Sequence, residues 1–432
     1  MGGAAGPFIL LGSLFALLIM GVPVAYALGI AAIVAALWSG IPLEAIFLKV
    51  SDGVDEFTLL AIPFFVFAGV LMAEGGMARR LVDFANIFVG FMRGGLAMVN
   101  ILASMFFGGI SGSAVADTSS IGSIMIPMMK KQGYEDHFSV NVTIASATQG
   151  IIIPPSHNAI IYAWATGGTV SIIQLFLAGI IPGIMIGVAL MVLAFIVAAR
   201  RDYPKGDPVT LRQALRISWE ALAGLLTIVI IVGGIVFGVF TPTESAAVAV
   251  VWAFFVTLFI YRDLKWRQLP QALATAVRTV AMVMIVIGFA ASFGYMMTLM
   301  QVPAAVTNFL LTLSENKYVL LLLINVMLLV LGTFMDMAPL ILICTPILLP
   351  VIKAIGVDPV HFGIVMMLNL GIGLITPPVG TVLFVGCAIG KVPIERASRH
   401  LWPFWLAMLI VLGLVTYIPE FAMTVPNWKF RN

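Results

Sequence analysis

The sequence predicts an all-α polytopic membrane protein built from an inverted structural repeat. Its 432 residues are 62% hydrophobic and 9% charged, whereas a soluble domain carries roughly 25% charged residues. Apolar stretches near or above the roughly 20 residues that cross a bilayer recur from end to end. A set of Gly and Pro residues recurs 223 positions further along the chain. Because no polar region is long enough for a soluble domain, we expect one membrane domain in two related halves.

Neither the N-terminal stretch nor the cysteines suggest processing or metal chemistry. The first basic residue is Lys49, so residues 8–20 lack the basic flank of a secretory signal and are predicted to be a mature span. Cys344 and Cys387 lie in apolar surroundings and predict neither a disulfide nor a metal site.

The basic residues give the expected orientation. They are densest between Arg200 and Arg216 and between Arg262 and Arg278, and the positive-inside rule places both stretches in the cytoplasm. An acidic loop is then expected on the outer side; its residues are Glu44, Asp52, Asp55 and Glu56.

Three spans are predicted first, at residues 6–20, 22–38 and 57–73. The first is short, and the sequence leaves open whether it fuses with the second, which would move the N-terminus to the other side of the membrane. Residues 77–93 follow, with apolar side chains on one face and Arg79 and Arg80 elsewhere. That pattern is typical of a helix lying in the membrane interface.

Residues 94–131 are predicted to form a re-entrant hairpin. The polar run GGISGSAVADTSS at 108–120 has only about 14 apolar residues on each side, too few for a full crossing at 1.5 Å per residue. Irregular polar backbone is tolerated at membrane depth only where it is buried in protein or lines a wet cavity. The tip of this hairpin is therefore a candidate site.

Residues 139–166 are predicted to form a broken helix. Pro154 and Pro155 in its middle remove backbone donors and disfavour helix at the preceding residue. The helix ends exposed by such a break are where secondary transporters hold ions and anions. A span at 176–199 completes the first half.

The second half repeats this order. Gly332, Pro350, Gly356, Pro377 and Pro378 correspond to Gly109, Pro127, Gly133, Pro154 and Pro155. The elements expected there are spans at 219–240, 241–261 and 279–300, a short amphipathic piece at 302–313, a hairpin at 318–353, a broken helix at 361–390, and a last span at 401–425. Because the first half makes five net crossings, the second half is expected to be inverted.

Polar groups at the two tips point to a carrier site for a cation and a coupled substrate. Asp117 and Asp336 are the leading candidates, because a charge at the bilayer centre costs roughly 2.5 to 3.5 kcal/mol on insertion scales. Hydroxyls and backbone carbonyls add hard oxygen ligands, which suit sodium better than a soft metal. The hydroxyls are Ser111, Ser113, Thr376 and Thr381, and the carbonyls lie around Gly109, Gly112, Gly332 and Pro377.

Each of these residues also has a purely structural interpretation. Gly and Ser within spans allow close helix packing, and Asp117 and Asp336 could cap the return helices of the hairpins. Glu244 is expected to cap a helix at the outer turn. His157 has no second ligand at metal-binding spacing, so it is expected to be a loop histidine near the site rather than a metal ligand.

No enzyme or nucleotide-hydrolysis motif is present. The chain has no GxxxxGK[ST] phosphate loop, no HExxH and no GxSxG. The expected energy source is an ion gradient, whose electrical part supplies roughly 2.3 kcal/mol per charge per 100 mV. A channel or an intramembrane enzyme would need continuous polar faces or catalytic pairs, which the sequence lacks.

Several segments together resemble the large membrane subunit of tripartite ATP-independent periplasmic (TRAP) transporters over nearly the whole chain. They are GGISGSAVADTSSIGSIMIPMM, IIIPPSHNAIIYA, LFLAGIIPG, FTPTESAAVAV, LGTFMDMAPLILICTPILLP and LNLGIGLITPPVGTVLFV. The resemblance implies sodium-coupled uptake of an organic acid, such as a four-carbon dicarboxylate or a sugar acid, delivered by a periplasmic binding protein. It also implies a separate small subunit of about four membrane helices, a bacterial inner-membrane location, and no nucleic-acid partner. Both termini would be periplasmic.

The resemblance further implies the elevator fold of the ion-transporter superfamily. The scaffold would be 1–73 and 219–300, the interfacial arms 74–93 and 301–317, and the moving transport domain 94–199 and 318–432, with a cytoplasmic loop at 200–218. The implied sodium ligands are Gly109, Gly112, Ser113, Asp117 and Pro154 in the first half and Gly332, Asp336, Thr376, Pro377 and Gly380 in the second. Substrate would lie near Ser111, Ser113, Pro155, Asn158 and Thr381. A sodium-coupled anion symporter that works without a binding protein is the alternative.

Overall fold

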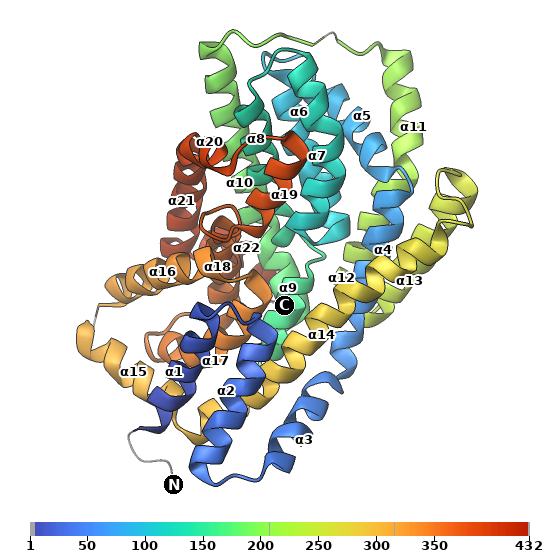
Figure 1. Ribbon diagram of the computed structural model, residues 1–432. Helices are drawn as coiled ribbons and strands as arrows, with labels where there is room; N and C mark the ends of the chain where they lie inside the picture. The colour runs from blue at the N-terminus through green and yellow to red at the C-terminus, as the bar shows by residue number, and fades with distance from the viewer. Residues whose placement is uncertain (1–4, 207, 315, 431–432) are drawn as a thin grey trace.

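The computed structural model describes residues 5–206, 208–314 and 316–430 (Figure 1). In these ranges its regular elements are all helices, apart from a single isolated bridge between Arg93 and Lys205. Seven of its helices are long and apolar enough to cross a membrane, and a bent pair at the C-terminal end makes an eighth. The predicted all-α membrane class is confirmed.

The first scaffold unit contains α1 (Gly6–Ile19), α2 (Val24–Ser39), α3 (Leu43–Val54), the 3₁₀ turn η1 (Phe57–Leu60) and α4 (Ala61–Glu74). The turn at Gly21, with φ of 80°, separates α1 from α2, so the two do not fuse. They pack side by side at the lower end of the molecule (Figure 1). At 14 and 16 residues, both are shorter than a standard span.

The expected acidic loop was wrong, because Glu44 and Asp52 lie within helix α3. Apolar residues at 43, 46, 47 and 50 have helical spacing, and this helix packs on α14. A Cβ at Gly53 would lie 2.2 Å from the Ala291 side chain. The acidic side chains occupy the face of the helix that is left exposed.

The second scaffold unit has three helical segments, each long enough to cross a membrane. They are α11 (Leu211–Ile228), continued by the π-turn η3 (Val229–Gly233) and α12 (Gly234–Val236); α13 (Pro242–Phe255), continued by η4 (Val256–Ile260); and α14 (Leu269–Leu299). Helices α11 and α14 begin eight and ten residues before the expected spans, so the expected loop at 200–218 is partly helical. Arg212, Arg216 and Arg278 are compatible with helix and keep their charges at its polar end.

Two shorter helices link the scaffold to the rest of the chain. These are α5 (Met77–Val89) and α15 (Val302–Leu313). On α5, Arg80 donates to Asp263 at 2.6 Å and lies over the ring of Tyr261 at 3.8 Å. Both partners belong to the segment that follows α13, so the first arm is attached to the second scaffold unit.

Each half then forms a helical hairpin followed by a broken helix. The first half has α6 (Gly95–Ser111), α7 (Ala114–Lys131), α8 (Asp136–Ala147), η2 (Thr148–Ile151), α9 (His157–Ala165) and α10 (Ile172–Arg200). The second has α16 (Lys317–Phe334), α17 (Met337–Ala354), α18 (Pro359–Gly373), α19 (Thr381–Gly390), α20 (Ile394–Arg399), α21 (Trp402–Tyr417) and α22 (Glu420–Phe430). Helices α7 and α17 have the same length and begin 223 residues apart.

The expected last span at 401–425 is not one helix. Helices α21 and α22 meet at a 50° bend. Pro419 lies at the break, and because proline has no backbone N–H, it cannot continue the hydrogen-bonding pattern of α21.

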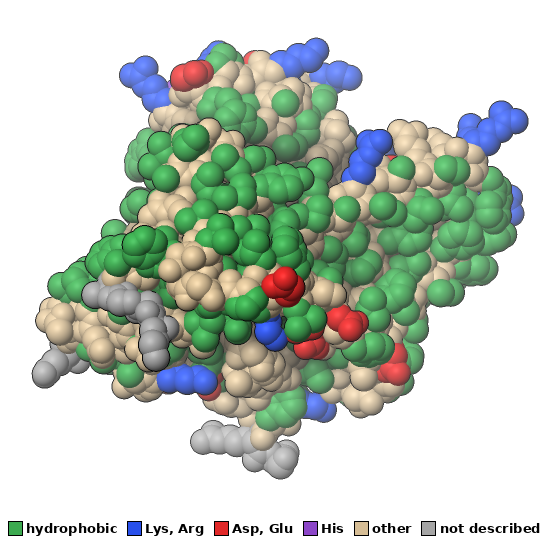
Figure 2. Space-filling model, turned by 60° about the horizontal axis from the view of Figure 1, so that its bottom comes forward, with side chains coloured by type: hydrophobic (Ala, Val, Ile, Leu, Met, Phe, Trp, Pro, Cys, Tyr) green, Lys and Arg blue, Asp and Glu red, His purple; other side chains and the backbone are tan. Residues whose placement is uncertain are grey.

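Charge is distributed unevenly over the two ends of the molecule. The segment between α10 and α11 runs across the top of Figure 1, whereas α1, α2 and α3 lie at the bottom. In Figure 2, Lys and Arg side chains project along the upper edge, whereas the lower face carries a group of acidic side chains together with some Lys and Arg, and apolar surface lies between the two. This pattern agrees with a basic cytoplasmic end.

Cysteines introduced at the two ends of the molecule should react with a thiol reagent from opposite sides of the membrane. Cys344 and Cys387 are buried, so the unsubstituted chain is the control and should remain unlabelled by a membrane-impermeant maleimide. We expect Asp55→Cys to be labelled in intact cells and Lys205→Cys only after permeabilisation. Labelling of both variants in intact cells would contradict this orientation.

Candidate functional site

The tip of the first hairpin is a two-residue turn between α6 and α7. Gly112 has φ of 60°, a left-handed conformation that favours glycine. Ser113 is the N-cap of α7, and its hydroxyl accepts from the backbone N–H of Ala116 at 3.4 Å. The capping role considered for Asp117 is therefore filled by Ser113.

This tip touches the first broken helix through its backbone. A Cβ at Gly108 would lie only 2.3 Å from the Cα of Gly150, and one at Gly112 only 2.8 Å from the carbonyl oxygen of Pro155. A Cβ at Gly109 would lie 3.3 Å from the carbonyl oxygen of Pro154. The structure thus places Gly109, Gly112 and Ser113 of the tip next to Pro154 and Pro155 of the break.

The second hairpin meets the second break in the same way. A Cβ at Gly373 would lie 2.7 Å from the backbone of Gly332, and Val379 donates its N–H to the carbonyl oxygen of Thr333 at 3.0 Å. Asp336 begins α17 without capping it, and its carboxylate accepts from the Thr381 hydroxyl at 3.4 Å. The suggested capping role of Asp336 is therefore absent, and its carboxylate remains available to a ligand.

The other implied sodium ligands of the second half, Thr376, Pro377 and Gly380, lie in or beside the second break. The Thr376 hydroxyl donates to the carbonyl oxygen of Ile372 at 2.7 Å. Gly380 has φ of 37° just before α19, and Pro377 lies within the break. Asp336 is exposed, whereas Ser111 and Asn158 of the first group are buried.

Each half contributes a helix that packs against the hairpin of the other half. Helix α9, after the first break, packs against α17 of the second hairpin, and α19, after the second break, packs against α7 of the first hairpin. The Lys130 ammonium at the end of α7 donates to the carbonyl oxygen of Gly390 at the end of α19, at 2.6 Å. Among the described residues no hydrogen bond joins Thr381 to the implied substrate contacts of the first half, which are Ser111, Ser113, Pro155 and Asn158.

Asp117 is placed differently from the other predicted ligands. It lies in the first turn of α7 and is fully buried. Neither of its carboxylate oxygens has a hydrogen-bond partner among the described residues.

The two other single-residue expectations have different outcomes. Glu244 forms the predicted cap, since its carboxylate accepts from the Thr241 N–H at 2.8 Å. His157 begins α9 with its backbone N–H beside Gly112. Within the described ranges no group of three His, Cys, Asp or Glu side chains could hold a metal ion.

Sequence reasoning missed the residues that make the closest contacts. The sequence analysis did not single out Gly108 and Gly150, although Gly108 lies at the predicted tip and Gly150 just before the predicted break. It also did not single out Thr333 and Val379, which form the backbone hydrogen bond of the second half. The glycines at 108 and 150 were a signal in the sequence that two backbones approach each other closely at this place. The backbone hydrogen bond of Val379 had no such signal, because any residue other than proline can form one.

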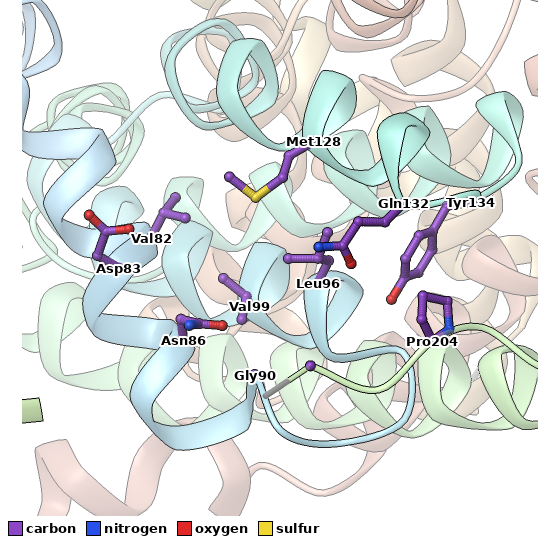
Figure 3. A pocket seen from close by; sticks show the side chains of 11 residues that line it. Val82, Asp83, Asn86, Gly90, Leu96, Val99, Met128, Gln132, Tyr134 and Pro204 are labelled. Atoms are coloured by element: carbon purple, nitrogen blue, oxygen red, sulfur yellow. The ribbon is translucent and has the colours of Figure 1, made fainter. Parts of the chain in front are cut away.

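A cavity of about 280 Å³ lies elsewhere, between α5, α6, α7 and residues 204–206 (Figure 3). Asp83, Asn86, Gln132 and Tyr134 supply its polar lining. Burial raises the pKa of Asp83, partly offset by Arg79. This cavity includes none of the predicted site residues, so it is not the site formed by the two tips.

Solved structures with a similar fold are membrane transporters. The structure resembles the YdaH transporter of Alcanivorax borkumensis with a TM-score of 0.67, covering 96% of this chain and 98% of that one. It also resembles MtrF of Neisseria gonorrhoeae, described as illuminating a class of antimetabolite efflux pumps, with a TM-score of 0.58 over 89% and 83% of the two chains. Both are 13% identical to this chain, so the likeness establishes the fold alone.

The family follows from sequence comparison. Residues 11–421 match the family described as "Tripartite ATP-independent periplasmic transporter, DctM component", and the chain belongs to this family of TRAP transporter large permeases. The protein YgiK of Salmonella typhimurium is 46% identical over 97% of both chains. The C4-dicarboxylate TRAP transporter large permease protein DctM of Pseudomonas aeruginosa is 42% identical over 91% of both. The sialic acid TRAP transporter large permease protein SiaM of Vibrio cholerae is 40% identical over 97% of this chain and 98% of its own.

The resemblance noted from the motifs is thereby confirmed. Two of these relatives, DctM and SiaM, are named as transporter permeases and not as enzymes, which agrees with the missing catalytic motifs.

A methyl group added between the first tip and the first break, where Gly108 meets Gly150, should destabilise the protein. Gly108→Ala places a methyl group against the backbone of Gly150, which cannot move as a flexible side chain would. We expect the free energy of unfolding to fall by roughly 1 to 3 kcal/mol, measured by thermal unfolding in detergent. Gly294→Ala, in open space within α14, is the matched control. Equal losses in both variants would contradict the close contact.

Proposed function

We propose that this large permease carries out sodium-coupled uptake of an organic acid delivered by a periplasmic binding protein. The observation that supports it most is the pair of hairpin tips, each packed by its glycines against a broken helix. Hard oxygen atoms gather at both contacts, and such ligands suit a sodium ion. Sodium is thus transported cargo, driven by its own gradient.

One sodium ion would bind at each tip. The first would be held around Gly109, Gly112, Ser113 and Pro154, largely by backbone carbonyls. The second would be held around Gly332, Asp336, Thr376, Pro377 and Gly380. Asp117, the other implied ligand of the first half, is buried without a hydrogen-bond partner among the described residues, whereas the Asp336 carboxylate is exposed at the second tip, so the second site offers a cation an accessible negative charge.

The substrate would be an organic anion bound between the tips. Helices α7, α9, α17 and α19 all begin at a tip or a break, and helix N-termini offer free N–H groups and positive partial charge to a carboxylate. Ser111, Ser113, Pro155, Asn158 and Thr381 are the proposed contacts. The acids in the names of the relatives, C4-dicarboxylate and sialic acid, belong to this class.

Transport would follow an elevator mechanism in the bacterial inner membrane. The transport domain, 94–199 and 318–432, would move against the scaffold of 1–73 and 219–300. The arms at 74–93 and 301–317 would join the two, and the loop at 200–218 and the basic end would face the cytoplasm. A small four-helix membrane subunit is the proposed second component, and both termini would be periplasmic.

Sodium should stabilise the purified protein selectively, through Asp336. A ligand that binds only the folded state stabilises it by RT ln(1 + [L]/Kd), about 2.7 kcal/mol at 100 times Kd. We expect the Tm of the wild type to rise with sodium at ionic strength held constant by choline, and Asp336→Asn to lose most of this rise. Asp55→Asn, at an exposed position, is the control and should keep it. A rise that is equal in potassium would refute sodium selectivity.

Uptake should also require the binding protein. In liposomes containing this chain and its small subunit, a sodium gradient should drive accumulation of a labelled organic acid only when the binding protein is supplied with it. Omitting the sodium gradient is the control. Sodium-driven uptake without the binding protein would favour the alternative, a sodium-coupled anion symporter that works alone.

A further inference from the structure

The cavity beside the first hairpin has walls from two parts of the molecule. One wall is helix α5, which Arg80 attaches to Asp263 behind the second scaffold helix at 2.6 Å. The other wall consists of α6, α7 and residues 204–206. At about 280 Å³, the cavity far exceeds the roughly 10 to 15 Å³ that hold one water molecule. It therefore has room for part of a larger molecule.

The lining of this cavity is partly polar and partly apolar. Figure 3 shows Asp83 and Asn86 on one side, Gln132 and Tyr134 on the other, and apolar side chains of α6 between them. Tyr134 is 3% exposed, and its hydroxyl has no hydrogen-bond partner among the described residues. Because leaving a buried polar group unpaired costs free energy, a ligand that bonds to this hydroxyl would be favoured there.

Asp83 is the only charged side chain among the lining residues. Arg80, one turn earlier on α5, is paired with Asp263, and Arg79 forms no ion pair with Asp83. Burial raises the pKa of the Asp83 carboxyl group, so its neighbours do not fully compensate its negative charge. A cation in the cavity would supply that compensation, whereas an anionic group would be repelled.

The hydrogen-bonding groups of the lining suit a primary ammonium group. The Asp83 carboxylate, the amide oxygens of Asn86 and Gln132 and the Tyr134 hydroxyl can all accept a hydrogen bond. A primary ammonium has three N–H donors, and its bonds to a carboxylate are strengthened by charge. A quaternary ammonium has the same charge but no N–H to donate.

The position of the cavity favours a lipid as the carrier of this group. Helix α5 has the amphipathic pattern of a helix that lies in the membrane interface. Phe88 and Phe91 are each 52% exposed and lie on either side of Gly90, a lining residue, in the chain. Exposed aromatic side chains at the interface contact lipid, so the cavity has apolar surface beside it for acyl chains.

We propose that this cavity binds the primary ammonium head of a phospholipid of the cytoplasmic leaflet, of the phosphatidylethanolamine type, with the Asp83 carboxylate accepting from the ammonium. The bound head touches both α5 and the hairpin, so it links the arm attached to the scaffold with α6 and α7. This assignment goes beyond the proposed function and does not depend on sodium coupling.

Lipid binding to the purified, delipidated full-length protein tests the assignment. Dihexanoyl phosphatidylethanolamine should raise the Tm, whereas phosphatidylcholine with the same chains, which has no N–H donor, should give no comparable rise. Asp83→Asn should weaken binding of the first lipid roughly tenfold or more. Asp55→Asn, at the opposite end of the molecule, is the control and should bind as the wild type does. Equal rises with the two lipids, or wild-type affinity in Asp83→Asn, would overturn the proposal.

A soluble head group separates the two possible sources of the ammonium. Glycerophosphoethanolamine carries the same head without acyl chains, and we expect it to bind far more weakly than the lipid. Equal binding of the two would assign the site to a soluble ammonium compound and overturn the lipid assignment.

A second variant covers the case in which Asp83→Asn does not fold. Tyr134→Phe removes only the unpaired hydroxyl and should also weaken binding of phosphatidylethanolamine; unchanged affinity would overturn the proposed contact. Failure of sodium to raise the Tm would count against the proposed function and leave the lipid result unaffected.

Discussion

The close packing of glycine backbones between each hairpin and its broken helix is the constraint on which the other features of the site depend. Gly108 meets Gly150 in the first half, and Gly332 meets Gly373 in the second. No other residue permits two backbones to approach so closely. Because of this approach, the backbone carbonyls and helix ends of the break lie next to the tip, where side chains would otherwise separate them. The hydroxyl groups at the tips and breaks and the carboxylate of Asp336 then add side-chain oxygens to a site whose shape the backbone sets.

The two halves have the same architecture but different chemistry. Asp336 stands at the second tip where Ser113 stands at the first, and Asp117 lies one turn inside the first hairpin where the second has Leu340. One carboxyl group is exposed at a tip and the other is sealed within the helices. Equivalent positions of the repeat thus carry different side chains, with a hydroxyl opposite a carboxylate at the tips and a carboxyl group opposite an apolar side chain one turn further along the return helices.

Much of this arrangement was predictable from the sequence, for physical reasons that apply to particular segments. Pro154 and Pro155, and their counterparts, interrupt long apolar runs, and proline cannot be accommodated in a helix interior without a break. The polar run at 108–120 is too costly to face lipid, so it had to be a buried tip. In contrast, residues 44–56 looked like an acidic loop because their four acidic side chains outweighed the short apolar face of α3, whose partner, α14, lies more than 200 residues away. The extensions of α11 and α14 into basic sequence were also missed, since hydropathy reports the membrane boundary and not the end of a helix. Which polar groups touch, as at Thr381 and Asp336, depends on tertiary packing that periodicity does not encode.

The exchange of helices between the halves has a consequence for biosynthesis. Helix α7 packs against α19, and Lys130 donates to Gly390, 260 residues later in the chain. The first hairpin therefore emerges from the ribosome long before its partner exists. Contacts of such long sequence separation form late and slowly, so the nascent first hairpin, with its polar tip, has to wait in an incomplete state. The first hairpin therefore reaches its final packing only after nearly the whole chain has been synthesised.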